Sequence, residues 1–222
     1  MKAVVKDVMS VHPTSVRKTA SFKELVARLR AYQVSAFPVL GDDGSVIGVV
    51  SDADMLAKEA LDGELHGMPG LIAGLAHHRA FRKAVGVTAG DLMTSPAVTV
   101  RPDDTIEHAA RLMYHRGLER LPVVDAAGRL TGIITRTDVL AVFDRPDEEI
   151  RLEIIGQVIP RFSEPSWYAV RVKDGIVTLE GTPEAISIGH EVLRQVRRVQ
   201  GVVAVRDRLV YPFPPSPAAP GA

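Results

Sequence analysis

Apolar and polar residues recur along the first 143 residues with two different periods, which predict helices and strands in a regular order. Apolar residues three and four apart predict two amphipathic helices, one with Phe22, Leu25, Val26 and Leu29 and one with Ile106, Ala109, Ala110 and Met113. Short apolar runs at 37–40 and 121–124 predict buried strands. Each run leads through a glycine turn, at Gly44 or Gly128, into a return strand at 46–50 or 130–134.

The two halves of this pattern are copies of each other. A shift of 84 positions superimposes Asp7-Val8-Met9 on Asp91-Leu92-Met93, Pro38-Val39 on Pro122-Val123, Gly48 on Gly132 and Ser51 on Thr135. A repeat of this length without gaps indicates a duplicated structural unit. Each copy is predicted to open with a short turn, the second one started by a Thr88–Asp91 capping box, and to have the order β-α-β-β-α. We expect an α/β (α+β) fold in which the copies pack about a pseudo-two-fold axis, with a cleft between them in two versions.

A third unit follows with its own pattern. Pro146 and acidic residues predict a helix start near Asp147. Alternating apolar residues predict a hairpin at 168–179 that turns at Asp174-Gly175, and a helix ended by Gly201 leads into a last strand at 202–210. The predicted order of this unit is α-β-β-α-β.

Composition excludes several function classes. Lys+Arg and Asp+Glu are equal, at 27 each, so no basic excess points to nucleic acid. The chain has no cysteine, which removes disulfides, thiolate catalysis and cysteine-ligated metals. No signal peptide and no membrane-spanning run is visible, and we expect a cytoplasmic protein.

The repeated features resemble the cystathionine-β-synthase (CBS) domain, and the pair resembles the tandem called a Bateman module. The features are the opening Asp-x-Met, the Pro-Val strand, the glycine hairpin and the Gly-x-x-Ser/Thr-x-x-Asp motif, each present twice. We assign repeat one to residues 1–60, an inter-repeat helical segment to 61–87 and repeat two to 88–143. The resemblance implies a regulatory module that binds an adenosine-type ligand, such as AMP, ADP or ATP, between its repeats and forms a homodimer through them.

The Ser/Thr-x-x-Asp motif offers chemistry that suits such a ligand. A hydroxyl at a strand-to-helix junction, Ser51 or Thr135, lies beside free backbone N–H groups that can hold a phosphate. A carboxylate one turn on, Asp54 or Asp138, can accept from a ribose diol. The same motif is also a plain helix cap, and both interpretations stay open. The full set of candidate ligand residues is Thr14, Ala36, Pro38, Gly48, Ser51 and Asp54 in repeat one, and Val98, Arg120, Pro122, Gly132, Thr135, Arg136 and Asp138 in repeat two.

The two versions of the motif differ in charge. Repeat two has Arg136 where repeat one has Asp52, and Arg120 where repeat one has Ala36. Because guanidinium groups favour phosphate, we expect the Thr135–Asp138 version to take a phosphorylated ligand better. The alternative is that both arginines are merely solvent-facing charges.

Residues 147–211 resemble a BON domain, on the segments 172–181 and 199–205 with their glycines. That resemblance implies contact with phospholipid or a protein partner. Arg194, Arg197 and Arg198 lie on one side of the predicted helix, which is more typical of a solvated face than of a membrane patch. Residues 212–222 are rich in proline and are expected to be a flexible tail.

The remaining sequence features give less information about function. A helix at 69–84 with a basic end is expected to be structural, and His77-His78 cannot share one side of it, so no metal site is predicted. Met9 and Met93 are interpreted as packing residues and Trp167 as a core residue. No nucleophile, base and metal set converges, so no catalytic residue is assigned. The two functions that remain are a nucleotide-sensing regulator and a structural protein that docks on a membrane or a protein through residues 147–211.

Overall fold

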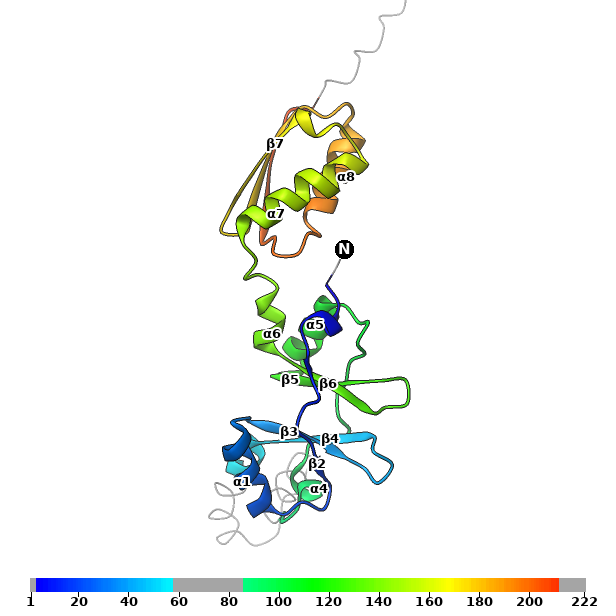
Figure 1. Cartoon of the computed structure of the whole chain (residues 1–222), viewed down its shortest axis with the longest axis vertical. Coiled ribbons are helices and arrows are strands. Elements are labelled where there is room, and N and C mark those ends of the chain that lie inside the picture. The colour runs from blue at the N-terminus through cyan, green and yellow to red at the C-terminus, as the bar shows by residue number, and fades with distance from the viewer. Residues whose placement is uncertain (1–2, 58–85, 212–222) are drawn as a thin grey trace, which may run out of the picture. The chain divides into compact units, whose positions relative to one another are not determined.

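The computed structural model describes residues 3–57 and 86–211. The predicted helix at 69–84, His77-His78 and the proline-rich residues 212–222 lie outside that part. The chain divides into two compact units, Val4–Arg136 and the residues from Thr137 onward, which are described separately (Figure 1). The division falls at the start of α6 (Arg136–Ala141). No helix of the described residues is long and apolar enough to cross a membrane.

The first unit contains most of the predicted elements of both repeats. The first strand predicted for repeat two is only a bridge of Val100 with Val123, and the last helix of that repeat, α6, falls in the other unit. Repeat one supplies η1 (Val5–Asp7), β1 (Ser10–Val11), β2 (Val16–Arg17), α1 (Phe22–Tyr32), β3 (Ala36–Leu40), β4 (Val46–Ser51) and a helix at 52–57. Repeat two supplies α4 (Ala89–Leu92), α5 (Ile106–Arg116), β5 (Arg120–Val124) and β6 (Leu130–Thr135). The side chains of Ser21 and Thr105 cap the starts of α1 and α5. Thr88 and Asp91 form the predicted capping box.

Two three-stranded sheets lie next to each other in this unit, with α1 and α4 on the outer side of one and α5 on the outer side of the other (Figure 1). One sheet has the order β2-β3-β4, in which β2 is parallel and β4 antiparallel to β3. The other has the order β1-β6-β5, so that a strand of repeat one completes the sheet of repeat two. Ser45 bridges Arg129, its own counterpart, across the pair.

The repeats exchange their opening segments, which we define as residues 4–11 and 88–94. The backbone N–H of Val5 donates to the backbone carbonyl of Asp104 at 2.8 Å, and that of Ala89 donates to the backbone carbonyl of Ala20 at 2.8 Å. These bonds are related by the 84-residue shift, as are the bridges of Val4 with Thr105 and of Thr88 with Ser21. The matched pairs confirm the pseudo-two-fold relation within this unit. The exchange itself was not predicted, because the repeated pattern of each copy is also compatible with a self-contained unit.

The exchange places side chains of one repeat in the core of the other. Ala89 and Leu92 are fully buried in a cluster whose other members come from repeat one, including Leu25, Phe37 and Val50. Burying a leucine side chain contributes about 1.5–3 kcal/mol. Repeat one is therefore completed by a segment that the chain supplies more than 30 residues later.

After α6, most of which belongs to it, the second unit has the predicted α-β-β-α-β order. Its elements are α7 (Asp147–Glu153), η2 (Ile154–Val158), η3 (Ile159–Arg161), η4 (Pro165–Trp167), β7 (Tyr168–Lys173), β8 (Ile176–Gly181), α8 (Ile186–Val196) and β9 (Ala204–Leu209). The sheet order is β7-β8-β9, antiparallel and then parallel. Helices α7 and α8 cover one face of it (Figure 1), where Val170, Leu179 and Val192 are buried.

The Asp174-Gly175 hairpin turn is confirmed, and both residues have positive φ, of 52° and 70°. The carboxylate of Asp147 accepts from the backbone N–H of Asp174 at 2.7 Å and of Gly175 at 2.8 Å. The first residue of α7 thus fixes the turn of the hairpin. This contact also explains why an acidic residue follows Pro146.

Two details of the second unit differ from prediction. The interpretation of Trp167 as a core residue was wrong, because its side chain is 43% exposed and its backbone lies against Gly181. The helix α8 ends at Val196 rather than continuing to Gly201, and β9 begins at Ala204. Val199 remains buried in the turns that follow α8, so helical spacing of apolar residues extended the prediction by one turn.

Candidate functional site

In the Ser51–Asp54 motif of repeat one, the two residues hydrogen-bond to each other. Ser51 ends β4, and a helix begins at residue 52. The Asp54 carboxylate accepts from the backbone N–H and from the hydroxyl of Ser51, both at 2.8 Å, and its own N–H donates to the Ser51 hydroxyl at 3.4 Å. Asp54 is 8% exposed, the one charged side chain that is buried among the described residues. The motif forms the reciprocal cap of a helix start and holds a carboxylate at the strand-to-helix junction.

The motif of repeat two occupies the same place in its repeat. Thr135 ends β6, and Asp138 lies in the first turn of α6, which follows directly. Thr135 and Asp138 are both half-buried. The backbone N–H of Arg136 donates to the backbone carbonyl of Glu119 at 2.9 Å. In repeat one the N–H of Asp52 donates to the backbone carbonyl of Ser35, also at 2.9 Å. Both helix starts are therefore tied to the residue that precedes the first hairpin strand.

Strand pairing brings several candidate residues to one end of each sheet. Ala36 pairs with Ser51 in the register of β3 and β4, and Arg120 pairs with Thr135 in the register of β5 and β6. We call these two places the sheet ends. A small buried residue faces the motif in repeat one, and an arginine faces it in repeat two.

Arg120 connects the two sheet ends. Its Nη2 donates to the hydroxyl of Ser35 at 2.5 Å and lies 3.5 Å from the carboxylate of Glu119. The side chain of Arg120 is only 16% exposed, so it is not the solvent-facing charge of the alternative interpretation. Sequence reasoning missed Ser35. The available signal was its position beside Ala36, where repeat two has Glu119.

Arg136 behaves differently from Arg120. Its side chain is exposed, and its Nε donates to the backbone carbonyl of Leu118 at 2.9 Å. The alternative of a solvent-facing charge describes Arg136. The two arginines that the sequence grouped together are therefore separated into an inter-repeat contact and a surface charge.

Gly48 and Gly132 accommodate methionines of the opening segments. A Cβ atom on Gly48 would lie 2.5 Å from the sulfur of Met93, and one on Gly132 would lie 2.6 Å from the sulfur of Met9. Both glycines were predicted as ligand residues, but in the structure a methionine of the other repeat fills the space beside each of them. The interpretation of Met9 and Met93 as packing residues is confirmed.

The remaining candidates support the strands. Pro38 and Pro122 are buried in β3 and β5, opposite Val49 and Ile133. Pro38 is tolerated because β2 pairs with β3 only from Val39 onward, which leaves the proline no missing bond on that side. Thr14 and Val98 are half-buried in the segments that lead toward the first helix of each repeat.

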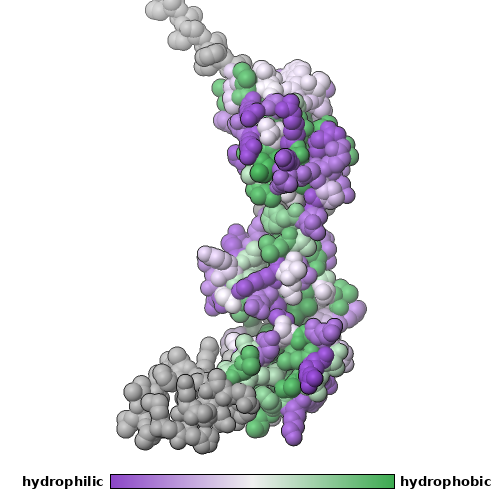
Figure 2. Space-filling model, turned by 90° about the vertical axis from the view of Figure 1, so that its left-hand side faces the viewer, coloured by the Kyte–Doolittle hydropathy of each residue, from purple (hydrophilic) through white to green (hydrophobic). Residues whose placement is uncertain are grey.

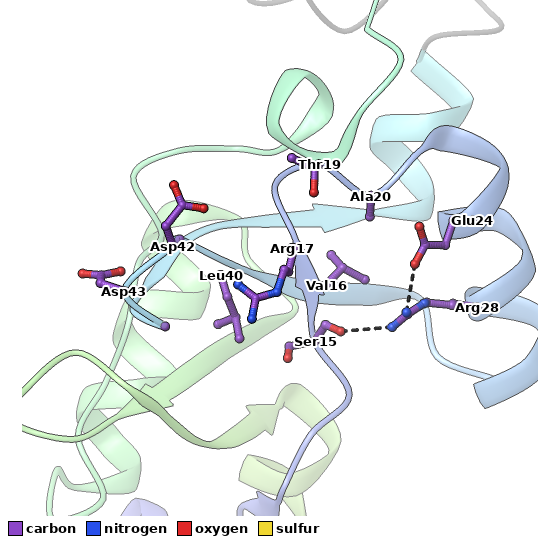
Figure 3. Close-up of a pocket in the computed structure, with 12 residues that line it drawn as sticks. Ser15, Val16, Arg17, Thr19, Ala20, Glu24, Arg28, Leu40, Asp42 and Asp43 are labelled. Carbon is purple, nitrogen blue, oxygen red and sulfur yellow. Dashed lines mark hydrogen bonds and ion pairs between the residues drawn. The ribbon is translucent and has the colours of Figure 1, made fainter.

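A cavity of about 690 Å³ lies elsewhere on repeat one (Figure 3). Residues of β2, the start of α1 and the β3–β4 turn line it, and none of the candidate ligand residues is among those described as lining it. Arg28 points toward Glu24, at 2.8 Å, and the Ser15 carbonyl, at 3.4 Å. Donation by the hydroxyl and N–H of Ser45 lowers the pKa of Asp43. Much of the charge in this cavity is thus already compensated by neighbouring groups.

Comparison with known proteins shows which family the two repeats resemble. The sequence profile of the CBS domain matches residues 5–60 and 89–145, about half of the chain. CBSX2, a chloroplastic CBS domain-containing protein of Arabidopsis thaliana, is 34% identical in an alignment of 133 positions that covers 56% of this chain and 56% of that protein. The chain thus spans little more than half the length of this curated relative.

Two solved structures share the fold. The structure of CBSX2 in complex with AMP matches with a TM-score of 0.54 and 32% identity, over 62% of this chain and 94% of that one. The CBS pair of MJ0100, solved with 5-methylthioadenosine and S-adenosyl-L-methionine, matches with a TM-score of 0.52 over 65% of this chain and 98% of that one. At 22% identity the second likeness concerns the fold alone. With its two matched segments and exchanged repeats, the chain belongs to the CBS domain family.

Proposed function

We propose that the protein binds an adenine nucleotide or related adenosyl compound at the sheet ends of its CBS pair and acts as a regulator rather than as a catalyst. One observation carries the proposal: both motif hydroxyls lie at sheet ends, and Arg120 reaches from one end to Ser35 at the other. The similarity to CBSX2, solved with AMP, supports an adenosine-type ligand.

The chemistry of the sheet ends suits such a ligand. The motif hydroxyls lie at helix starts, where a phosphate is favoured. In repeat one a phosphate would replace bonds that the N–H groups of Ser51 and Asp54 make within the motif. Asp54 and Asp138 offer carboxylates for a ribose diol, and in repeat one the diol would share the carboxylate with the hydroxyl of Ser51. Ala36, Pro38, Thr14 and Val98 would supply apolar and small surface near the base. In this proposal Gly48 and Gly132 act indirectly, by seating the opening segments.

The two versions differ in their affinity for a charged ligand. Arg120 and Arg136 favour an anion in repeat two, whereas Asp52 in repeat one disfavours it. Of the two, Arg120 has the stronger case, because it is largely buried while Arg136 is exposed. We therefore assign the tighter phosphate interaction to Thr135 and Arg120, while Asp138 accepts from the ribose diol.

Arg120 also suggests how binding would be sensed. A phosphate near its guanidinium would compete with the hydroxyl of Ser35, which belongs to the other repeat. Ligand would then favour the inter-repeat arrangement in which this bond is exchanged for the phosphate, which is a shift between two populations. The signal lies in the contact between repeats, not in a chemical step.

Calorimetric titration with AMP tests the proposal on the intact chain. Asp138→Asn keeps the shape of the side chain but removes its charge, and we expect AMP to bind at least about tenfold more weakly. Asp54→Asn should have a smaller effect. Thr137→Ala, an exposed neighbour in α6, is the matched control and should leave affinity unchanged. If both aspartate variants lower the unfolding temperature without changing affinity, the motifs are helix caps only.

The second unit suggests a second candidate function. Its α-β-β-α-β order and Asp174-Gly175 hairpin support the BON-type assignment of residues 147–211. Arg194, Arg197 and Arg198 are exposed at the end of α8, where they could meet phospholipid headgroups or an acidic protein. Salt-sensitive binding to anionic vesicles would favour a docking protein. We favour the solvated interpretation, in which vesicles are not bound.

We also propose that the CBS pair forms a homodimer. Several large apolar side chains of the first unit are exposed, namely Val26, Tyr32, Val34, Leu56 and Tyr114. Figure 2 shows apolar surface interspersed among hydrophilic surface on one face of the molecule. A stable monomer at micromolar concentration in light scattering would exclude the dimer.

A further inference from the structure

A second cavity lies in the second unit, at the end of its sheet. It measures about 520 Å³ and is lined by Trp167, Gly181, Thr182, Pro183 and Glu184. We call it the Trp167 cavity. Three strand ends meet there, because the start of β7, the end of β8 and the end of β9 are paired through Tyr168, Gly181 and Leu209.

The backbone of Trp167 is fixed while its indole stays outside the core. A Cβ atom on Gly181, whose φ is 145°, would lie 2.0 Å from the Trp167 carbonyl oxygen, so the two backbones touch. The Trp167 side chain is nonetheless 43% exposed. An anchored residue with an exposed indole presents an apolar ring and one N–H donor to whatever enters the cavity.

The chain itself leaves the sheet beside this cavity. The backbone N–H of Val210 donates to the Gly181 carbonyl at 2.8 Å, which places the last described residues against the cavity wall. Gly189 lies between the ring of Tyr211 and the ring of Pro183, since a Cβ there would be 2.7 Å and 2.9 Å from them. The ring of Tyr211, the last described residue, therefore lies close to Pro183, which lines the cavity.

Those residues have the composition that aromatic cavities bind. Residues 212–222 read Pro-Phe-Pro-Pro-Ser-Pro-Ala-Ala-Pro-Gly-Ala. A polyproline II helix has three residues per turn, so Pro214, Pro217 and Pro220 would share one edge. Such a segment offers prolines to stack on an aromatic ring and carbonyls to accept from an indole N–H. At about 3.1 Å per residue it is long enough to cross the cavity.

We propose that the Trp167 cavity is the docking site of the chain's own proline-rich segment, residues 212–222, bound with the edge of Pro214, Pro217 and Pro220 toward the indole. The segment would cover the apolar surface that Trp167 and Pro183 contribute to the cavity. We assign it to the same molecule because it directly follows Tyr211 in the sequence, so its effective concentration at the cavity would be high.

Trp167 is the only tryptophan of the chain, so its fluorescence reports on this cavity directly. We compare the full chain with one that stops after Tyr211. We expect the truncated chain to emit at longer wavelength and to be quenched by iodide roughly twice as strongly, since the indole becomes more exposed. A synthetic peptide of residues 212–222 should restore the full-chain emission when it is titrated into the truncated chain. Identical emission and quenching of the two chains would overturn the proposal.

Two variants separate the proline edge from mere chain length. Pro214→Ala, Pro217→Ala and Pro220→Ala together should reproduce the truncated spectrum. Pro212→Ala with Pro215→Ala, on another edge, is the matched control and should keep the full-chain spectrum. Equal effects of both sets would contradict the assigned edge. A spectrum that depends on protein concentration would assign the cavity to the segment of a second copy and overturn docking within one molecule.

Discussion

The two repeats share a backbone but differ at their sheet ends. Their opening segments are exchanged through matching hydrogen bonds, and each methionine packs on the glycine of the other repeat. In contrast, repeat one has Ser35 and Ala36 where repeat two has Glu119 and Arg120. Buried contacts constrain the common architecture, whereas side chains at the sheet ends are free to differ. Binding preference in such a pair is therefore set at a few positions on a nearly symmetric frame.

The largest expected effect tests whether the exchanged segments contribute equally. Leu92→Ala removes a fully buried side chain of repeat two from the core of repeat one. We expect the free energy of unfolding to fall by about 2–5 kcal/mol. Its counterpart Val8 is smaller and half-buried, so Val8→Ala should cost less. Urea unfolding followed by circular dichroism measures both variants, and equal losses would mean that the exchange is symmetric in energy as well as in geometry.

The next largest effect is expected on nucleotide binding, to which the two repeats should contribute unequally. Asp138→Ala removes a hydrogen bond to a ligand hydroxyl, a loss of about 1.5–3 kcal/mol, and Asp54→Ala should lose less. Titration calorimetry with AMP compares the two variants. Thr135→Ala combined with Arg136→Ala is expected to weaken binding by a factor of about ten or more as well. Losses of the same size in the Asp54 and Asp138 variants would contradict the predicted asymmetry.

Substitutions of Gly48 and Gly132 test whether the packing of the opening segments on the sheets contributes to stability. Gly48→Ala places a methyl group 2.5 Å from the Met93 sulfur and 3.0 Å from the Thr94 carbonyl, so the opening segment must shift. We expect a loss of about 1–3 kcal/mol in unfolding free energy, and a similar loss for Gly132→Ala.

Gly156→Ala is the control for the glycine variants, because a Cβ there meets no atom within 4 Å. It should be neutral or slightly stabilising. Combining Gly48→Ala with Met93→Ala should cost less than the sum of the two single changes, since the smaller side chain relieves the clash. Additive losses would show that Met93 is not the obstacle.

The smallest expected effect concerns the contact between sheet ends. Ser35→Ala removes the acceptor of the Arg120 guanidinium, and we expect the unfolding free energy to fall by about 0.5–1.5 kcal/mol. Glu119→Ala, at the equivalent position of repeat two, removes only an exposed contact at 3.5 Å and should change stability by less than about 0.5 kcal/mol. Thermal unfolding compares the two. The reverse order would remove Ser35 from the inter-repeat contact.

Local patterns were sufficient to predict most elements. Helical spacing from Phe22 to Leu29 and the glycine turns at Gly44 and Gly128 are confirmed by α1 and by the two hairpins. The Thr88–Asp91 capping box could be predicted because all its atoms belong to four consecutive residues. The period of the apolar residues was less reliable at element ends, as the early end of α8 at Val196 shows. An apolar residue such as Val199 is buried equally well by a turn.

Candidate residues were predicted better than their contacts. The register of the hairpins brings Ala36 to Ser51 and Arg120 to Thr135. It includes a shift of one residue after Val39 and after Val123, and the length of the turn does not predict such a shift. The contact of Arg120 with Ser35 joins residues 85 positions apart. No local pattern contains such a distance, and the importance of Ser35 emerged only from the packing of two repeats.

The sequence by itself determined the duplication, most of the order of elements in the two repeats and in residues 147–211, and the residues that differ between the repeats. Periodicity, capping and turn chemistry depend on neighbouring residues, so they can be interpreted without coordinates. Only the tertiary structure decided that the opening segments exchange, that Gly48 and Gly132 seat methionines, and that the Trp167 indole lies outside the core. The physical reason is that an apolar residue shows a need for burial but not the partner that covers it. That partner is selected by the packing of segments distant in the chain.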